Sequence, residues 1–186
     1  IIDTLIETLH TRNPRERRHS VAVSEMCTSI GKALGLPETE IKRLGKAGYL
    51  HDIGKITLDK NTIDRAFMTE DEQEMDKTHS ISGYRILNLF DDTLDLAEYV
   101  YSHHERWDGT GSPRGLKGEE IPLIARIISV AETYDRVLNR GEQPLHERKK
   151  TAAGVIREGA GTQFDPHIAE LFLKLIDDSG PVSGKI

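Results

Sequence analysis

Five histidines of this sequence lie in segments where apolar residues recur at helical spacing, and an aspartate directly follows one of them. They are His19, His51, His79, His103 and His104, with Asp52 next to His51. Burying imidazoles and carboxylates costs free energy unless they are paired or bound to a metal. Imidazole nitrogens and carboxylate oxygens are also the ligands that first-row divalent metals take. Placed on the inner faces of different helices, these side chains predict one convergent metal site.

The adjacent pair His51 and Asp52 could serve two metal ions, because the histidine binds one while the aspartate bridges both. Two ions about 3.5–4 Å apart are the usual arrangement for cleaving phosphoesters, because they activate a shared hydroxide and neutralise phosphate oxygens. Glu132 lies on the inner flank of a later helix and offers another oxygen ligand. Lys55 follows His51 by four residues and could place its ammonium on a substrate phosphate.

The alternative for each histidine alone is a structural or surface role, and the dipeptide His51-Asp52 alone is weak evidence. The string from Leu50 to Ile56, followed by His79 and then by residues 103–106, is far more specific. We expect the other three histidines to be solvated or to cap helices; they are His10, His146 and His167. The one cysteine, Cys27, lies at helical spacing among apolar residues and is interpreted as core packing rather than a nucleophile.

Composition narrows the function classes. The chain has 186 residues, of which 30% are charged and 5% aromatic, and its formal net charge is −6. This acidic balance argues against a DNA or RNA polymer as partner, which would need a basic face. A small anionic substrate stays compatible, provided that metal ions supply local positive charge. No run of 18 apolar residues occurs, so we expect no membrane segment, and a single cysteine fits a reducing cytoplasm.

Hydrophobic periodicity predicts an all-α fold of about eight helices, near residues 1–11, 14–34, 37–51, 69–90, 94–104, 121–138, 146–158 and 166–178. Asn13 is the expected N-cap of the second helix, with Pro14 as its first residue and Gly35 just past its end.

We divide the chain into an N-terminal helix at 1–12, a metal-dependent domain at 13–178 and a flexible tail at 179–186. The first helix could connect to an upstream domain. Its apolar residues could alternatively pair with a second copy of the chain; they are Ile1, Ile2, Leu5 and Leu9.

The motif residues resemble the HD superfamily of phosphohydrolases and, within it, the HD-GYP family. The family pattern is a histidine early in a helix, then HD-x-GK, a lone histidine, HHE-R-x-DG-x-GYP-x-G-L-x-G, and a helix with VAD. This chain has His19, HDIGK at 51–55, His79, HHERWDGTGSPRGLKG at 103–118 and VAE at 130–132. GTQFDP at 161–166 resembles the family's closing G-x-x-FDP, so the match covers roughly 13–175.

The resemblance implies an all-helical HD bundle, with five core helices and additional ones, that hydrolyses cyclic di-GMP or a related cyclic dinucleotide. It implies two divalent transition-metal ions, often iron or manganese, with a bridging hydroxide as nucleophile. The family's ligand positions are matched by His19, His51, Asp52, His79, His103 and His104, and the catalytic lysine by Lys55. Such domains usually follow a sensory or receiver domain. The loop at 108–118 matches the segment that shapes the substrate pocket.

Several residues depart from the family pattern. Ser112 replaces the tyrosine of GYP, and Glu132 replaces the usual metal-binding aspartate, for which Asp135 one turn later could compensate. Family members with three metals carry a glutamate four residues before the first histidine, where this chain has Arg15, so we expect two metals. The family's basic R-P-Y-R segment is replaced by residues 143–146, and Arg140 or Arg148 could take over its role. The expected substrate-binding residues are Lys55, Asp108, Gly111, Ser112, Arg114, Asp135 and Arg140.

Three functions are compatible with these residues. The favoured one is a two-metal phosphodiesterase that hydrolyses a cyclic dinucleotide, most simply cyclic di-GMP. The second is a catalytically weakened domain that signals by binding a nucleotide or a partner protein, as the departures at Ser112, Glu132 and Gln143 would allow. The third is an HD hydrolase with a different phosphoester substrate.

Overall fold

The computed structural model describes residues 1–58 and 70–178, with the side chains of 70–77 and 178 left out. The tail expected at 179–186 lies outside the described residues. The α-helices are α1 (Ile2–Arg12), α2 (Pro14–Ala33), α3 (Glu38–Leu50), α5 (Glu70–Leu87), α6 (Leu94–Ser102), α7 (Leu123–Leu138), α8 (Leu145–Gly159) and α9 (Pro166–Asp178). Three short 3₁₀ helices are η1 (Ile53–Thr57), η2 (Asp91–Thr93) and η3 (Gly118–Glu120). The all-α prediction is confirmed.

The ends of α2 follow from local sequence, as expected. The side chain of Asn13 accepts hydrogen bonds from the backbone N–H groups of Arg15 at 3.0 Å and Glu16 at 3.4 Å, and Pro14 is the first helical residue. Gly35 follows the helix with φ of 70°, the left-handed conformation that glycine adopts without strain. Cys27 is wholly buried on the inner face of α2, and burial raises the pKa of its thiol, which fits core packing.

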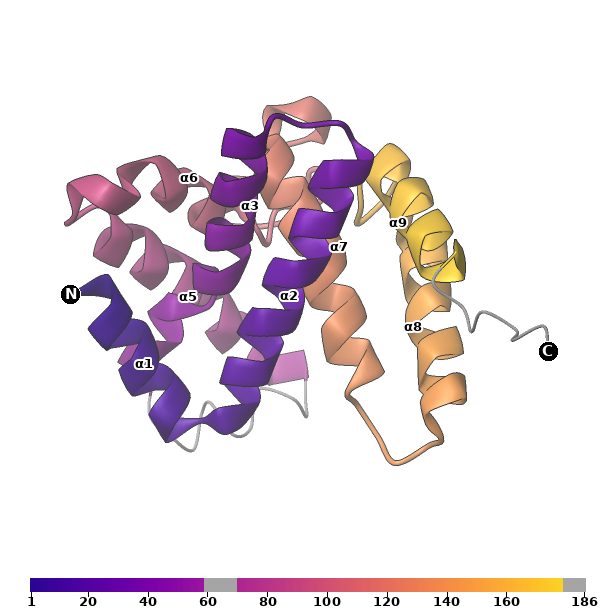
Figure 1. The fold of residues 1–186 in the computed structure, drawn as a ribbon, viewed down its shortest axis with the longest axis horizontal. Helices are drawn as coiled ribbons and strands as arrows, with labels where there is room; N and C mark the ends of the chain where they lie inside the picture. The colour runs from indigo at the N-terminus through magenta and orange to yellow at the C-terminus, as the bar shows by residue number, and fades with distance from the viewer. Residues whose placement is uncertain (59–69, 179–186) are drawn as a thin grey trace.

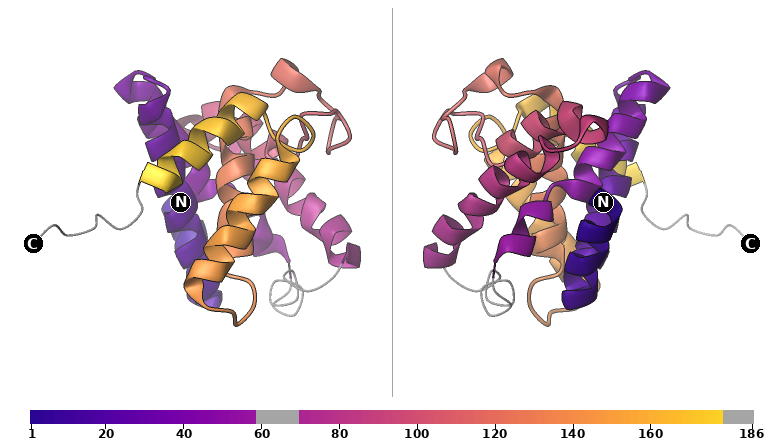
Figure 2. Two further views of the ribbon diagram at one scale, coloured as in Figure 1. Left: turned by 90° about the vertical axis from the view of Figure 1, so that its right-hand side faces the viewer. Right: turned by 90° about the vertical axis from the view of Figure 1, so that its left-hand side faces the viewer.

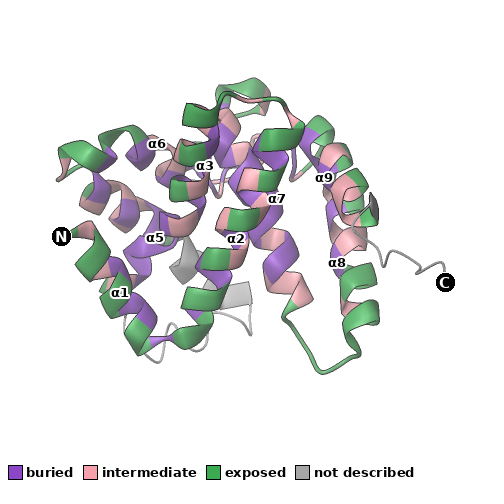
Figure 3. Ribbon diagram, in the orientation of Figure 1, coloured by how far each residue is buried: buried purple, intermediate pink, exposed green. Residues whose placement is uncertain are grey.

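Two helices form the centre of the bundle, α2 and α7, and they run side by side (Figure 1). Helix α7 is buried on every face between residues 127 and 132, as a central helix must be. Helices α3, α5 and α6 lie on one side of this pair, and α8 and α9 cover the other side (Figures 1 and 2). Buried residues line the inward faces throughout (Figure 3). Within the described residues, no helix has the length and apolar character needed to cross a bilayer.

Helices α3, α5 and α6 end earlier than predicted, and the endings of α3 and α6 place histidines. Helix α3 ends at Leu50 and α6 at Ser102, so His51, His103 and His104 lie in the turns that follow rather than within helices. The first of these turns packs closely against α5: a Cβ added to Gly54 would lie 1.9 Å from the carbonyl oxygen of His79. The glycine of the HD-x-GK string is therefore required for this contact between η1 and α5.

Helix α1 is part of the core, which corrects the expectation of an exposed apolar face. Leu9 is wholly buried, while Ile1 keeps 80% of its surface exposed. The turn at Asn13 folds α1 back against α2 and η1, so its inner stripe is already covered. His10 is also buried, with its ring against the Ser20 hydroxyl at 3.2 Å, and the expectation that it is solvated is wrong.

Candidate metal centre

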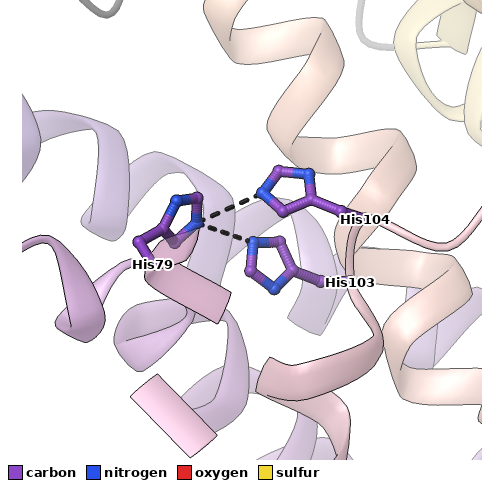
Figure 4. A group of neighbouring side chains, drawn as sticks. All are labelled: His79, His103 and His104. Atoms are coloured by element: carbon purple, nitrogen blue, oxygen red, sulfur yellow. Dashed lines mark hydrogen bonds between the residues drawn. The ribbon is translucent and has the colours of Figure 1, made fainter. Parts of the chain in front are cut away.

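The predicted ligands gather into two adjacent clusters at the centre of the bundle. One combines His19 of α2 with His51 and Asp52 after α3, and the other combines His79 of α5 with the two histidines after α6 (Figure 4). Within each cluster, one ligand atom per residue lies within 4.8 Å of the others. The first cluster is called the α2 half-site and the second the α5 half-site; the latter is His79, His103 and His104.

The carboxylate of Asp52 lies between the two half-sites. Its Oδ2 is 3.2 Å from Nε2 of His51 and 3.6 Å from Nε2 of His19, and its Oδ1 is 3.0 Å from Nε2 of His79. One oxygen thus faces each half-site. This is the geometry that a carboxylate bridging two ions requires.

Two of the histidines are held through Nδ1 by backbone carbonyls, which leaves Nε2 directed at the centre. Nδ1 of His51 lies 2.7 Å from the carbonyl oxygen of Gly48, and Nδ1 of His103 lies 2.5 Å from that of Val100. A carbonyl can only accept, so each Nδ1 donates its proton there and each Nε2 is the nitrogen that faces the centre. Metal-binding histidines are typically oriented in this way.

Nitrogen atoms of the α5 half-site lie close to one another. Nε2 of His79 is 3.2 Å from Nε2 of His103 and 3.2 Å from Nε2 of His104 (Figure 4). Burial, followed by the repulsion of His104, holds the pKa of His103 well below its usual range, so its imidazole is neutral. Neutral imidazoles with converging nitrogens fit a divalent metal ion.

Asp135 orients the remaining α2 ligand, His19. Its Oδ2 lies 2.6 Å from Nδ1 of His19, and the amide of Asn139 donates to its Oδ1 at 3.1 Å. A carboxylate in this position fixes the imidazole and increases its basicity. Asp135 was expected at the substrate; it contacts His19 and also lines a cavity beside it, so that role stays a prediction. In the sequence, the only sign of a role for Asp135 was its position one turn after Glu132 in the predicted helix.

Lys55 is wholly buried beside the centre and held by two carboxylates. Its Nζ lies 2.8 Å from Oδ2 of Asp52 and 3.3 Å from each carboxylate oxygen of Glu16. Sequence reasoning missed Glu16, although its position three residues before His19 places both on one face of α2. The ammonium predicted to contact substrate phosphate is thus positioned against the central aspartate.

Arg136 is the second basic residue at the centre, and sequence reasoning missed it. Its Nε lies 2.8 Å from Oε1 of Glu132, one turn earlier on α7, and its guanidinium lies 3.4 Å from Oδ2 of Asp52. Oε2 of Glu132 is 3.9 Å from Nε2 of His103, so this carboxylate faces the centre as predicted. Arg136 therefore lies between two candidate ligands.

Two of the acidic side chains at the centre, Asp52 and Glu132, are ionised. Burial alone would raise the pKa of Asp52, but His51, Lys55 and Arg136 together hold it well below its usual range. Burial likewise opposes ionisation of Glu132, and Arg136 is the largest of the influences that lower its pKa. Both carboxylates can therefore act as anionic ligands near neutral pH.

Two cavities open on either side of this centre. One, of about 520 Å³, adjoins the α2 half-site; it is lined by Arg15, Arg18, His19, Ala22, Asp135, Arg136, Asn139, Arg140 and Gly141. The other, of about 410 Å³, adjoins the α5 half-site; its lining includes His103, His104, Arg106, Gly111, Ser112, Glu132, Arg136 and Arg140. Arg136 and Arg140 line both. Their charge suits an anionic ligand.

The glycine-rich loop reaches the second cavity through Gly111 and Ser112. A Cβ on Gly111 would lie 2.3 Å from the backbone nitrogen of Arg106, so only glycine allows the chain to pass there. The loop is held by the buried carboxylate of Glu105, which accepts from the backbone N–H groups of Arg114 at 2.7 Å and Leu116 at 3.0 Å. The sequence placed Glu105 in the HHE string but did not predict that its carboxylate holds the loop.

Two charged residues expected near substrate have other partners. The guanidinium of Arg114 pairs with Glu98 and lies 4.9 Å from the centre of the Tyr101 ring. Asp108 accepts from Thr110 within its own turn and from Arg106 at 3.3 Å. Neither Arg114 nor Asp108 lines the two cavities.

Arg148, a candidate for the missing basic segment, donates to two backbone carbonyls. The acceptors are Leu138 at 2.6 Å and Gln143 at 2.9 Å. It therefore holds the connection between α7 and α8, and Arg140 is the flanking arginine that reaches the cavities.

The sequence profile of the HD domain family matches residues 3–168. A cyclic di-GMP phosphodiesterase of Thermotoga maritima is 35% identical over 167 residues, which are 88% of this chain and 45% of that protein. A cyclic di-GMP phosphodiesterase response regulator of Xanthomonas campestris is 34% identical over 155 residues, 82% of this chain and 41% of that protein. A 3'3'-cGAMP-specific phosphodiesterase of Vibrio cholerae is 29% identical over 169 residues, 89% of this chain and 36% of that protein.

Solved structures share the fold. A cyclic GMP-AMP-specific phosphodiesterase of V. cholerae superposes with a TM-score of 0.68 at 22% identity, over 87% of this chain and 44% of that one. An HDG"Y"P protein of Bdellovibrio bacteriovorus gives a TM-score of 0.69 at 22% identity, over 87% of this chain and 52% of that one. This chain spans less than half the length of the curated relatives named above.

Proposed function

Because this chain belongs to the HD domain family and, within it, to the HD-GYP branch, we propose that it is a metal-dependent phosphodiesterase that hydrolyses a cyclic dinucleotide, with cyclic di-GMP as the first candidate. The observation that carries the proposal is Asp52, whose two carboxylate oxygens each face one cluster of histidines. The relatives named above act on cyclic di-GMP or 3'3'-cGAMP, which supports this class of substrate.

We propose two divalent transition-metal ions, iron or manganese, as cofactors. His19 and His51 would hold one ion and the α5 half-site the other, with Asp52 shared and Glu132 as a further oxygen ligand. Such ions would lower the pKa of bound water and neutralise phosphate charge. The protein's own part is to present imidazole nitrogens and carboxylate oxygens in fixed orientations. Lys55 contributes by holding Oδ2 of Asp52 in place.

The substrate would lie against the cavity lined by Gly111 and Ser112, with its phosphates toward Arg136 and Arg140. These arginines would supply the positive charge that the segment at 143–146 lacks. Guanidinium groups bind phosphate with two parallel hydrogen bonds, which makes them effective substitutes. Ser112 offers no ring for stacking on a base, so purine selectivity would rest on other residues of the loop.

The second candidate is a catalytically weakened domain that binds a nucleotide or a protein and signals by contact. The observation that favours it is Arg136, whose charge already neutralises two candidate metal ligands, Asp52 and Glu132. A hydrolase of another phosphoester is a third candidate, which the same assays distinguish.

We also propose a cytoplasmic location, since cyclic dinucleotides of this class are intracellular messengers. One relative is a response regulator more than twice as long as the matched region, which supports an upstream receiver or sensory module in the full protein. A homodimer stays a prediction, to be checked by light scattering on the purified chain.

Anaerobic purification, elemental analysis and a cyclic di-GMP assay with iron or manganese test the proposal. We expect bound transition metal and turnover, and a loss of at least about a thousandfold in Asp52→Ala, because several kcal/mol of metal-dependent stabilisation disappear. Asp91→Ala, which removes an exposed carboxylate, should keep full activity. Metal without turnover on any cyclic dinucleotide would favour a binding role, and turnover of a linear phosphodiester alone would favour the third candidate. Failure to bind metal under any loading condition would reject the mechanism.

A further inference from the structure

We infer that Arg136 is a built-in competitor for one of the two ions: its guanidinium holds Asp52 and Glu132, so the α2 half-site binds its ion more weakly than the α5 half-site. The inference rests on the metal-binding part of the proposed function and not on the identity of the substrate.

The contacts of Arg136 define the competition. Its Nε is 2.8 Å from Oε1 of Glu132, and its guanidinium is 3.4 Å from Oδ2 of Asp52. That oxygen is the one that faces His19 and His51, at 3.6 and 3.2 Å. An ion bound by these two imidazoles would therefore have to take Oδ2 from a guanidinium already beside it. The side chain of Arg136 is only 13% exposed, so solvent screens this contact weakly.

The α5 half-site faces other carboxylate oxygens. Its histidines are His79, His103 and His104, and Oδ1 of Asp52 lies 3.0 Å from Nε2 of His79. Oε2 of Glu132 lies 3.9 Å from Nε2 of His103, whereas Arg136 contacts Oε1 of that carboxylate. Arg136 thus contacts Oδ2 of Asp52, which faces the α2 half-site, while the oxygens that face the α5 half-site are Oδ1 and Oε2.

When an ion displaces the guanidinium of Arg136, the side chain can move into a neighbouring cavity. Arg136 lines both cavities, and the larger one also contains Arg15, Arg18 and Arg140. Movement away from Asp52 would bring its charge into the space where the phosphate of an anionic ligand would lie. Arg136 thus links occupation of the α2 half-site to the substrate side of the centre.

Titration of Mn²⁺ into the chelator-treated chain, followed by calorimetry, tests the inference without any substrate. We expect one tight site and a second at least about tenfold weaker, as one nearby unit charge can produce. In Arg136→Gln the weaker site should tighten by about tenfold or more while the tight site stays unchanged. Paramagnetic resonance should then show coupled Mn²⁺ pairs at two equivalents in the variant and fewer in the parent chain.

The matched control is Arg140→Gln, which removes the same charge from the same two cavities but from an exposed residue just after the end of α7. It should change the weaker site by less than about threefold. Equal affinities of the two sites in the parent chain, no change in Arg136→Gln, or the same change in Arg140→Gln would each overturn the inference, as would a chain that binds no Mn²⁺.

If Arg136→Gln does not fold, as judged by circular dichroism, the same titration is done with Arg136→Lys instead. A lysine ammonium cannot span both carboxylates as the guanidinium does, so the weaker site should still tighten. No tightening there would reject the inference. The two proposals can fail separately. If the metal affinities are as expected but the chain does not hydrolyse cyclic dinucleotides, the inference about Arg136 stands and only the proposed activity is rejected.

Discussion

The nitrogens that face away from the centre decide how the histidines can act. His51 and His103 donate from Nδ1 to carbonyls three residues earlier, Gly48 and Val100. His19 instead relies on a side chain 116 residues away, the carboxylate of Asp135. The first two orientations are therefore built into local turns, whereas the third depends on how α2 packs against α7.

Asp135→Asn tests this dependence at the scale of one residue. The amide keeps the shape but loses the charge that makes His19 a better ligand, so affinity at the α2 half-site should fall by about tenfold or more. The affinity of the α5 half-site should stay within error. Metal titration by calorimetry measures both, with the exposed Asp91→Asn as control. An unchanged α2 half-site would show that Asp135 does not orient the ligand.

At the scale of elements, the turns after α3 and α6 carry most of the centre. The turn after α3 presents His51 and Asp52 and packs through Gly54 against α5, while the turn after α6 presents His103 and His104. The glycine-rich loop follows directly and is held by Glu105. The loop also pairs with residues 162–163, because Trp107 and Asp108 donate backbone N–H groups to the carbonyls of Gln163 and Thr162. Metal ligands and cavity wall are thus parts of one connected segment.

Glu105→Gln tests the anchoring of this loop. The buried carboxylate accepts two backbone N–H groups, and an amide can satisfy only one of them. We expect unfolding free energy to fall by about 1–3 kcal/mol in urea denaturation. KM for the cyclic dinucleotide should rise more than kcat falls, with metal content unchanged.

The exposed Glu119→Gln is the control and should match the parent chain. A Glu105 variant with normal stability and normal KM would mean that the loop is held by its other contacts alone.

At the scale of the whole molecule, the centre ties together helices from both sides of the bundle. Its side chains extend from Glu16 to Arg136 and come from α2, α7 and the segments between them. An ion bound here contacts parts of the chain that are distant in sequence and joined only when the bundle is folded. Metal binding must therefore stabilise the fold as a whole.

Thermal unfolding with and without Mn²⁺ measures this coupling. An ion present at 100 times its Kd should add about 2.7 kcal/mol to the free energy of unfolding, so Tm should rise clearly above that of the chelator-treated chain. His146→Ala, a change at an exposed histidine, should keep the full increase. Asp52→Ala should lose most of it. An equal increase in Asp52→Ala would place the bound ion elsewhere.

Local sequence was enough to predict that the helices exist, where α2 begins and ends, and which residues are the candidate ligands. Asn13, Pro14 and Gly35 act on backbone groups within a few residues of themselves, so the ends of α2 could be predicted from local rules. The metal site could be predicted because its residue types and spacings have few other uses. The family profile across residues 3–168 agrees with that interpretation.

The partners of these residues depend on packing between distant segments, which the sequence does not reveal. Glu16 meets Lys55, Asp135 meets His19, and Arg136 meets Asp52 through packing between segments far apart in the chain. Periodicity places a side chain on a helix face but does not fix which charged group lies across from it. The distribution of positive charge around the two half-sites, and hence their predicted inequality, follows from how α2, α7 and η1 pack together.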